Sequence, residues 1–95
     1  MSLQVRHESE TDRYAVYDAD GALQGWVVYD VDGSTMRLLH AEVPPFLRGK
    51  GVGGDVVRSV LDELRASRTE RIQPICGFVR GWMRDHSDYA DLTTR

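Results

Sequence analysis

The segment from residue 48 to residue 54, Arg-Gly-Lys-Gly-Val-Gly-Gly, holds the residues of this chain best suited to chemistry. Four of these seven residues are glycines, which leave backbone N–H groups open to close approach by a ligand. A helix-like pattern follows, and the free N–H groups and dipole of a helix N-terminus favour an anion, above all a phosphate. Arg48 and Lys50 add positive charge there. The segment therefore predicts a site for a phosphate-bearing cofactor.

Two common nucleotide-binding motifs fit this loop poorly. Gly49-x-Gly51-x-x-Gly54 has the spacing of the dinucleotide fingerprint, but that fingerprint needs a tight strand-to-helix turn and an acidic residue after the next strand. Pro44-Pro45 instead lie in the approach, and the next predicted strand ends in Cys76-Gly77. A Walker A loop also fails, because a proline stands in place of its first glycine and a glycine in place of its Ser or Thr.

Alternating apolar residues and turn signals predict the strands that lead to and from this loop. A short strand is expected around Leu3–Val5. The other strands are predicted at Tyr14–Tyr17, Leu23–Val31, Thr35–Val43 and Arg71–Cys76. A two-residue turn at Asp32-Gly33 would set Tyr29 opposite Met36 and Gly25 opposite His40, unless a bulge shifts the pairing. Both faces of this hairpin carry large apolar side chains, so we expect both to be covered.

Helical periodicity predicts one long helix and one short helix. Apolar residues recur on one face from Lys50 to Ala66, as in an amphipathic helix. Residues Gly77–Arg84 predict a short helix that buries Phe78, Val79, Trp82 and Met83. Tyr89 and Leu92 are expected to pack in the tail, and the predicted strand with Pro74 should be an edge or splay from its neighbour. The fold class is α+β, with a small, mostly antiparallel and partly splayed sheet, a glycine-loop helix and a short C-terminal helix.

Composition bounds the class of protein. With 95 residues, the chain is expected to form one domain over residues 1–95. The net charge of -3 and the lack of a long basic run argue against nucleic acid as a partner. One cysteine, no signal-like start and no long apolar run predict a cytoplasmic protein without a membrane partner. His7, His40 and His86 lack metal-ligand spacing with Cys76, so no metal is expected.

The loop also has the form R-x-x-G-x-G between a strand and an amphipathic helix, which resembles the acetyl-CoA loop of the GNAT superfamily of N-acetyltransferases. The resemblance extends to the minimal, single-domain GNAT-like family and covers about Tyr14 to Leu92. It rests on four ordered blocks, His40–Pro44, Arg48–Gly51, Pro74–Cys76 and Arg84–Tyr89. One departure is Ser87, where that family usually has a proline, and it affects the tail turn rather than the loop.

The resemblance implies transfer of an acetyl group from acetyl-CoA to an amine acceptor of unknown identity. The acceptor could be a small amine or a protein or peptide amine, and the protein is expected to be a monomer or a weak homodimer. Main-chain groups near Glu42 and Val43 would pair with the pantetheine arm, and an amide there would polarise the thioester carbonyl. The pyrophosphate would be bound by Arg48, Gly49, Lys50, Gly51, Val52, Gly53 and Gly54.

Three side chains are candidates for the chemical step. Cys76 precedes a helix, which lowers a thiol pKa, so it could relay the acyl group; otherwise it is a small buried or pocket-lining residue. His40 could be the general base or a histidine hydrogen-bonded in the sheet. Glu42 could act through a water or be an exposed carboxylate at the strand end.

Two other functions remain open for the same residues. The loop could bind CoA or acetyl-CoA without turnover, which makes the protein a binding module. The loop could also be only a structural turn in a protein-interaction domain, which then binds no CoA. The first alternative needs the same glycine loop as the enzyme, so the sequence does not separate them.

Overall fold

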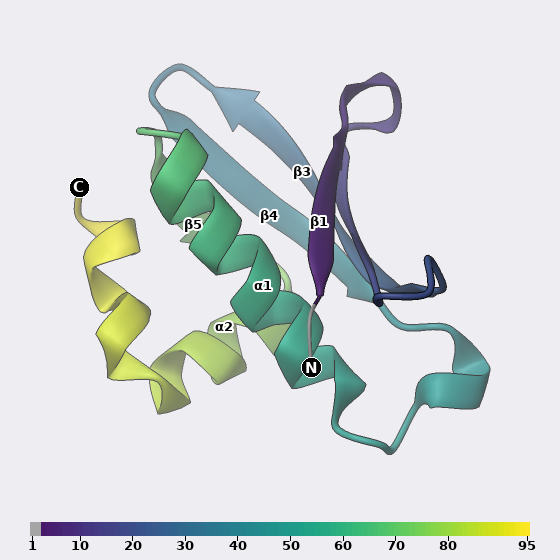
Figure 1. Ribbon diagram of the computed structural model, residues 1–95. Coiled ribbons are helices and arrows are strands. Elements are labelled where there is room, and N and C mark those ends of the chain that lie inside the picture. Colours follow the sequence, from purple (N-terminus) through teal and green to yellow (C-terminus); the bar gives the residue numbers. More distant parts are fainter. Residues whose placement is uncertain (1–2) are drawn as a thin grey trace.

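The computed structural model of this protein describes residues 3–95 and shows an α+β fold (Figure 1). Five strands form one sheet in the order β1-β2-β3-β4-β5. The first three pairings are antiparallel, and β4 pairs with β5 in parallel. The strands are β1 (Gln4–Glu8), β2 (Arg13–Tyr17), β3 (Leu23–Asp32), β4 (Thr35–Glu42) and β5 (Arg71–Pro74). The helices are α1 (Val52–Ser67) and α2 (Gly77–Asp85), with short 3-10 turns η1 (Ser9–Thr11), η2 (Pro45–Leu47) and η3 (Ser87–Thr93).

The core lies between α1 and one face of the sheet. The apolar stripe of α1 predicted from the sequence is buried, as are the side chains of the sheet that face it. Tyr89 and Leu92 of η3 are buried as predicted, with 5% and 0% of their surface exposed. The buried residues of α1 are Val56, Val57, Val60, Leu61 and Leu64, and they meet Tyr14, Val16, Val27, Met36 and Leu38 of the sheet.

The second face of the sheet differs from the prediction. Figure 1 shows α1, α2 and the C-terminal segment on the same side of the sheet, so within residues 3–95 no helix covers the other side. The large side chains there are covered by arginines instead. The guanidinium of Arg13 lies 5.0 Å from the ring centre of Trp26, and that of Arg6 lies 4.2 Å from that of Tyr17. Cation–π contacts of this kind shield an aromatic face without a second layer.

The predicted register of the β3–β4 hairpin is wrong in two ways. Asp32 pairs with Thr35, so the turn is one residue later than Asp32-Gly33. Gly33 stands at the first turn position with a left-handed φ of 61°, as such hairpin turns require. A bulge then follows, because Tyr29 pairs with Leu38 while Val28 pairs with His40. The expected pairs of Tyr29 with Met36 and of Gly25 with His40 therefore do not form.

Several element bounds also differ from those predicted. The first strand is longer than the expected segment around Leu3–Val5, since β1 continues to Glu8. α1 begins at Val52 rather than at Lys50, because Gly51 has a left-handed φ of 77° and cannot belong to the helix. β5 ends at Pro74, so Cys76 is the residue that precedes α2. Phe78 was expected in the core, but 53% of its surface is exposed.

β4 and β5 part after four paired residues, which confirms the splayed sheet predicted from Pro74. Their pairing runs from Thr35 opposite Arg71 to Leu38 opposite Pro74. The carbonyl oxygen of Leu38 then accepts hydrogen bonds from the amides of both Ile75 and Cys76, each 2.9 Å long. β4 continues to Glu42 beyond this point with β3 on one side and no β5 partner on the other.

Candidate functional site

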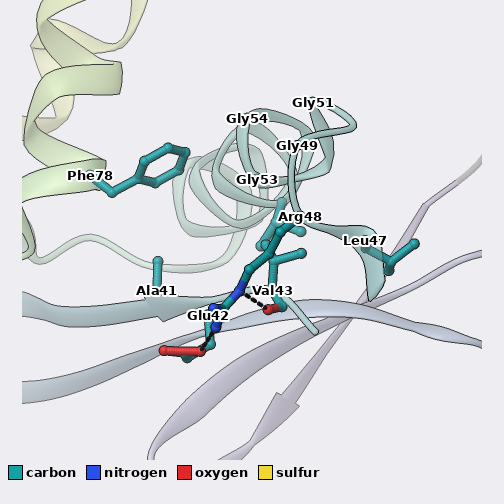
Figure 2. Close-up of a pocket in the computed structure, with 11 residues that line it drawn as sticks. Ala41, Glu42, Val43, Leu47, Arg48, Gly49, Gly51, Gly53, Gly54 and Phe78 are labelled. Atoms are coloured by element: carbon teal, nitrogen blue, oxygen red, sulfur yellow. Dashed lines mark hydrogen bonds and ion pairs between the residues drawn. The ribbon is translucent and has the colours of Figure 1, made fainter. Parts of the chain in front are cut away.

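A cavity of about 410 Å³ lies where β4 leaves β5 and meets the glycine loop (Figure 2). Its volume is within the range of small-molecule sites in proteins. The end of β4, the loop, the first turn of α1 and the first turn of α2 form its walls. The lining residues are Ala41, Glu42, Val43, Leu47, Arg48, Gly49, Gly51, Gly53, Gly54, Val56 and Phe78.

The glycines of the loop shape one wall of this cavity. Gly49 and Gly51 have left-handed φ values of 82° and 77°, a conformation that costs other residues energy. Gly53 is needed for a different reason, because a Cβ atom there would lie 3.0 Å from Cζ of Phe78. The loop thus presents backbone rather than side chains to the cavity.

The N-terminus of α1 opens at this wall. The first N–H groups of a helix have no partner within the helix, and no described side chain caps those of α1. Gly51 occupies the N-cap position, where it offers no side-chain acceptor of its own. Lys50 is exposed beside it. This end of a helix of 16 residues is therefore suited to bind an anion.

Glu42 contacts two other predicted residues, His40 and Arg48, at the mouth of the cavity. One of its carboxylate oxygens is 2.8 Å from Nε2 of His40, and the other accepts a 3.2 Å hydrogen bond from Arg48. Nε of Arg48 also donates to the carbonyl oxygen of Val43 at 3.2 Å, as the dashed lines in Figure 2 show. The structure brings His40, Glu42 and Arg48 together in one chain of contacts.

The bulge in β4 decides which way these side chains point. Val27 of the core pairs with Ala41, so Ala41 faces α1 and the cavity. His40 and Glu42 belong to the opposite face, which no helix in residues 3–95 covers. The side chains of His40 and Glu42 therefore point to the open face of the sheet, while Glu42 also borders the cavity at the strand end.

Cys76 lies at the branch point of the sheet and not in the cavity wall. Its side chain is half-buried and packs against the core. Its amide donates to Leu38, and its carbonyl accepts from the amide of Arg80 in α2. Cys76 lies between the end of β5 and the start of α2, as predicted. Among the described residues, no hydrogen bond joins it to His40 or Glu42.

Four apolar residues of the cavity were not predicted as site residues. They are Ala41, Leu47, Val56 and Phe78. Phe78 had no distinguishing signal in the sequence, because it belongs to the same apolar arc of α2 as Val79, Trp82 and Met83. Val79 and Met83 take the buried part of that arc, which leaves Phe78 to the cavity.

A profile of GCN5-related N-acetyltransferases matches residues 13–92. The chain belongs to this family. The match confirms the predicted membership of the GNAT superfamily. Members of the family transfer acetyl groups and use acetyl-CoA as the co-substrate. A search among proteins of curated function found no match to this sequence.

One solved structure supports the same fold. A GCN5-like protein from Staphylococcus aureus, solved by NMR in solution, matches 97% of this chain with 89% of its own, at a TM-score of 0.66 and 22% identity. At that identity the likeness concerns the GNAT fold alone. A crystal structure of nourseothricin acetyltransferase shares 22% identity over 67% of this chain and 52% of its own, with a TM-score of 0.42.

The residues of the cavity fit an acetyl-CoA molecule in chemical terms. The open N–H groups at the start of α1 suit a pyrophosphate. The side chains of Ala41, Val43 and Phe78 give apolar walls for the pantetheine arm. The edge of β4 beyond Leu38, which β5 leaves free, offers main-chain groups to amides of that arm.

Two histidines of this GNAT protein make hydrogen bonds away from the cavity. His7 is hydrogen-bonded to Tyr29, and Nδ1 of His86 lies 2.7 Å from the carbonyl oxygen of Trp82. Across residues 3–95, no group of three or more His, Cys, Asp and Glu side chains is arranged to hold a metal ion. No helix in this range is both long and apolar enough to cross a membrane.

Proposed function

We propose that this protein transfers the acetyl group of acetyl-CoA to an amine on a protein or peptide. One observation carries the proposal. A single cavity connects the uncapped N-terminus of α1 with the free edge of β4 at the branch point of the sheet. The phosphates of one extended cofactor can bind at the helix N-terminus while its thioester end lies along the strand edge. The chain also belongs to an acetyltransferase family.

The cofactor is bound mainly by backbone groups in this proposal. Residues Gly49–Gly54 donate N–H groups to the pyrophosphate, and Arg48 and Lys50 supply positive charge. Main-chain groups of Glu42 and Val43 pair with the pantetheine arm. An amide at this strand end stabilises the negative charge that develops on the thioester oxygen, and loss of one such donor typically costs about 10²–10³ in rate.

The pair formed by His40 and Glu42 removes the proton from the acceptor. An ammonium group cannot attack, and a histidine or a carboxylate near the acceptor can take its proton. The neutral nitrogen then attacks the thioester carbon, the C–S bond breaks, and CoA leaves as a thiolate. The nitrogen loses its second proton as the amide forms, and the thiolate takes up one proton in return. His40 has 56% and Glu42 31% of its side chain exposed, so an acceptor can reach both.

The open face of the sheet supports a macromolecular acceptor. His40 and Glu42 lie on the face that no helix in residues 3–95 covers. A small amine would find little enclosure on such a surface. A lysine side chain or N-terminus on a protein needs less enclosure by this surface, because the rest of that protein positions the amine.

Direct attack suits this site better than relay through Cys76. Relay would form an acetyl thioester on the Cys76 sulfur before transfer to the amine. The cavity, however, is lined by Glu42 and not by Cys76, whose side chain packs against the core. A search for S-acetylated Cys76 by mass spectrometry distinguishes the two routes.

Acetyl transfer is tested with acetyl-CoA labelled in the acetyl group and a panel of protein lysines, peptide N-termini and small amines. The proposal expects labelled product with wild-type protein, a loss of rate with Glu42→Gln, and wild-type rate with Glu10→Gln, a matched change in exposed η1. Binding of acetyl-CoA without transfer to any acceptor would favour the alternative, a CoA-binding module. If the protein neither binds acetyl-CoA nor transfers its acetyl group, the alternative that remains is a protein-interaction domain.

A further inference from the structure

Arg48 belongs to the glycine loop but contacts β4. Its guanidinium donates to Oε2 of Glu42 and to the carbonyl oxygen of Val43, both at 3.2 Å. Figure 2 shows the side chain lying across the mouth of the cavity toward the strand rather than toward the start of α1. The residue expected to bind phosphate is therefore engaged with the strand in this structure.

These contacts compete with the binding of a phosphate. A guanidinium presents its N–H groups as a rigid planar fork, so an orientation that serves one anion is unavailable to another. The carboxylate of Glu42 and a phosphate at the N-terminus of α1 are rival anions for the same cation. The Val43 carbonyl is likewise a group that the proposed pantetheine contact requires.

We infer that Arg48 is a latch on β4 that is released when a phosphate of the cofactor binds. This inference rests on the proposed function. In the latched arrangement seen in this structure, Arg48 contacts Glu42 and the Val43 carbonyl. Once a phosphate draws the guanidinium to the loop, the carboxylate oxygen of Glu42 and the carbonyl oxygen of Val43 that Arg48 occupied are free to meet the acceptor and the pantetheine arm. Arg48 is thus a positioning residue as well as a phosphate ligand.

The exposure of the pair makes this exchange feasible. Arg48 has 61% and Glu42 31% of its side chain exposed, and contacts between exposed charges are weak, since water screens them. A multiply charged phosphate assisted by the open N–H groups of α1 is the stronger partner. A deeply buried pair would instead resist opening.

Release of Arg48 leaves the proposed base intact. Glu42 contacts Arg48 through one carboxylate oxygen and His40 through the other, the latter at 2.8 Å. Loss of the first contact does not require loss of the second. The latch therefore frees one carboxylate oxygen of Glu42 when the cofactor binds and keeps the contact of the other with His40.

A double-mutant cycle on CoA affinity tests the latch without an activity assay. Glu42→Gln removes the rival anion, so we expect CoA to bind about two- to fivefold more tightly by titration calorimetry. Part of that gain would come from lower negative charge alone. In the Arg48→Ala background only this general part should remain, so the gain should be at least about twofold smaller there.

Asp55→Asn is the matched charge control. Asp55 lies in the first turn of α1 and is exposed, and its loss should alter CoA affinity equally with and without Arg48. If Glu42→Gln raises CoA affinity equally with and without Arg48, the latch is overturned. The proposed function would still stand in that case, because the wild type binds CoA. Absence of CoA binding by the wild type would instead remove the proposed function, and the latch with it.

A second measurement uses the wild-type protein and does not depend on the folding of a variant. The Nε–H resonance of Arg48 reports its contact with Val43. The latch predicts that saturating CoA shifts this resonance, and that adenosine, which lacks phosphate, does not. An Arg48 resonance that is unchanged by bound CoA would contradict the latch.

Discussion

The backbone N–H of Cys76 donates a 2.9 Å hydrogen bond to the carbonyl oxygen of Leu38, the last β4 residue that pairs with β5. The amide of Ile75 donates to the same oxygen. One carbonyl therefore fixes both the end of the parallel pairing and the start of α2. The free strand edge of the proposed cofactor site depends on this main-chain junction and not on the thiol.

Removal of the Cys76 side chain should therefore be tolerated. Cys76→Ala retains the amide that bonds to Leu38, so we expect CoA affinity within about twofold and a transfer rate within about threefold of the wild type. Titration calorimetry measures the CoA affinity, and steady-state kinetics measure the transfer rate. A rate loss of 10²-fold or more with normal CoA binding, together with an acetyl adduct on wild-type Cys76, would establish the relay route instead.

Gly53→Ala should weaken CoA binding while sparing the fold. A Cβ atom at this position would lie 3.0 Å from Cζ of Phe78, and the half-exposed ring can turn away only by altering the cavity. Alanine favours a helix over glycine by about 1 kcal/mol, so we expect stability close to that of the wild type. CoA affinity should fall by about tenfold.

Gly77→Ala is the matched control, because no atom lies within 4 Å of a Cβ atom there. It should leave CoA affinity unchanged. Replacement of Phe78 by leucine in the Gly53→Ala background should recover part of the lost affinity by relieving the contact. A Gly53→Ala protein that binds CoA as tightly as the wild type would show that the ring does not limit the cavity.

Gly51→Ala should lower the stability of the protein through backbone conformation alone. Gly51 has a φ of 77°, and a Cβ atom there meets no neighbour within 4 Å. The expected loss is about 1 kcal/mol in the free energy of unfolding, measured in urea, with a smaller loss for Gly51→Asn. Equal stability of the Ala variant and the wild type would be inconsistent with this conformation.

The pair formed by Arg68 and Glu70 predicts a dependence of stability on pH. Two hydrogen bonds from the Arg68 guanidinium, 2.9 and 2.6 Å long, lower the pKa of Glu70 from 4.5 to about 2. A carboxyl whose pKa is lower in the folded state stabilises that state above its unfolded pKa. This contribution should be complete above pH 4.5 and lost as the pH falls toward 2.

Glu70→Gln should accordingly be less stable than the wild type at pH 7 by about 1–2 kcal/mol. The difference should shrink between pH 4.5 and pH 2, where the wild-type carboxyl takes up its proton. Urea unfolding at a series of pH values measures it. A difference between the two proteins that stays constant down to pH 2 would argue against the lowered pKa.

The sequence predicted the elements of the fold better than their pairing. A repeat of 3.6 residues with six apolar positions defined α1 to within two residues at each end. The hairpin of β3 and β4 offered no such signal, because Trp26 and Val28 on one face are as apolar as Val27 on the other. With no polar face to set the register, neither the later turn nor the bulge could be recognised.

The site was predicted where its backbone is encoded locally. The loop was recognised from its four glycines, its two basic residues and the helical pattern that follows, and the structure then shows glycines 49 and 51 in the left-handed region. The exposure of Phe78 depends on how α2 packs, and the contact between Arg48 and the Val43 carbonyl depends on the path of the intervening turn. Such tertiary relationships leave no mark in residue spacing.

The central claim is that acetyl-CoA binds along the glycine loop and the end of β4. The most direct test is a titration of ¹⁵N-labelled protein with acetyl-CoA, followed by backbone amide resonances. The account predicts saturable shifts at Gly49–Gly54, Glu42 and Val43, and none in η1, which borders a separate cavity. Absence of shifts, or shifts confined to other parts of the chain, would contradict it.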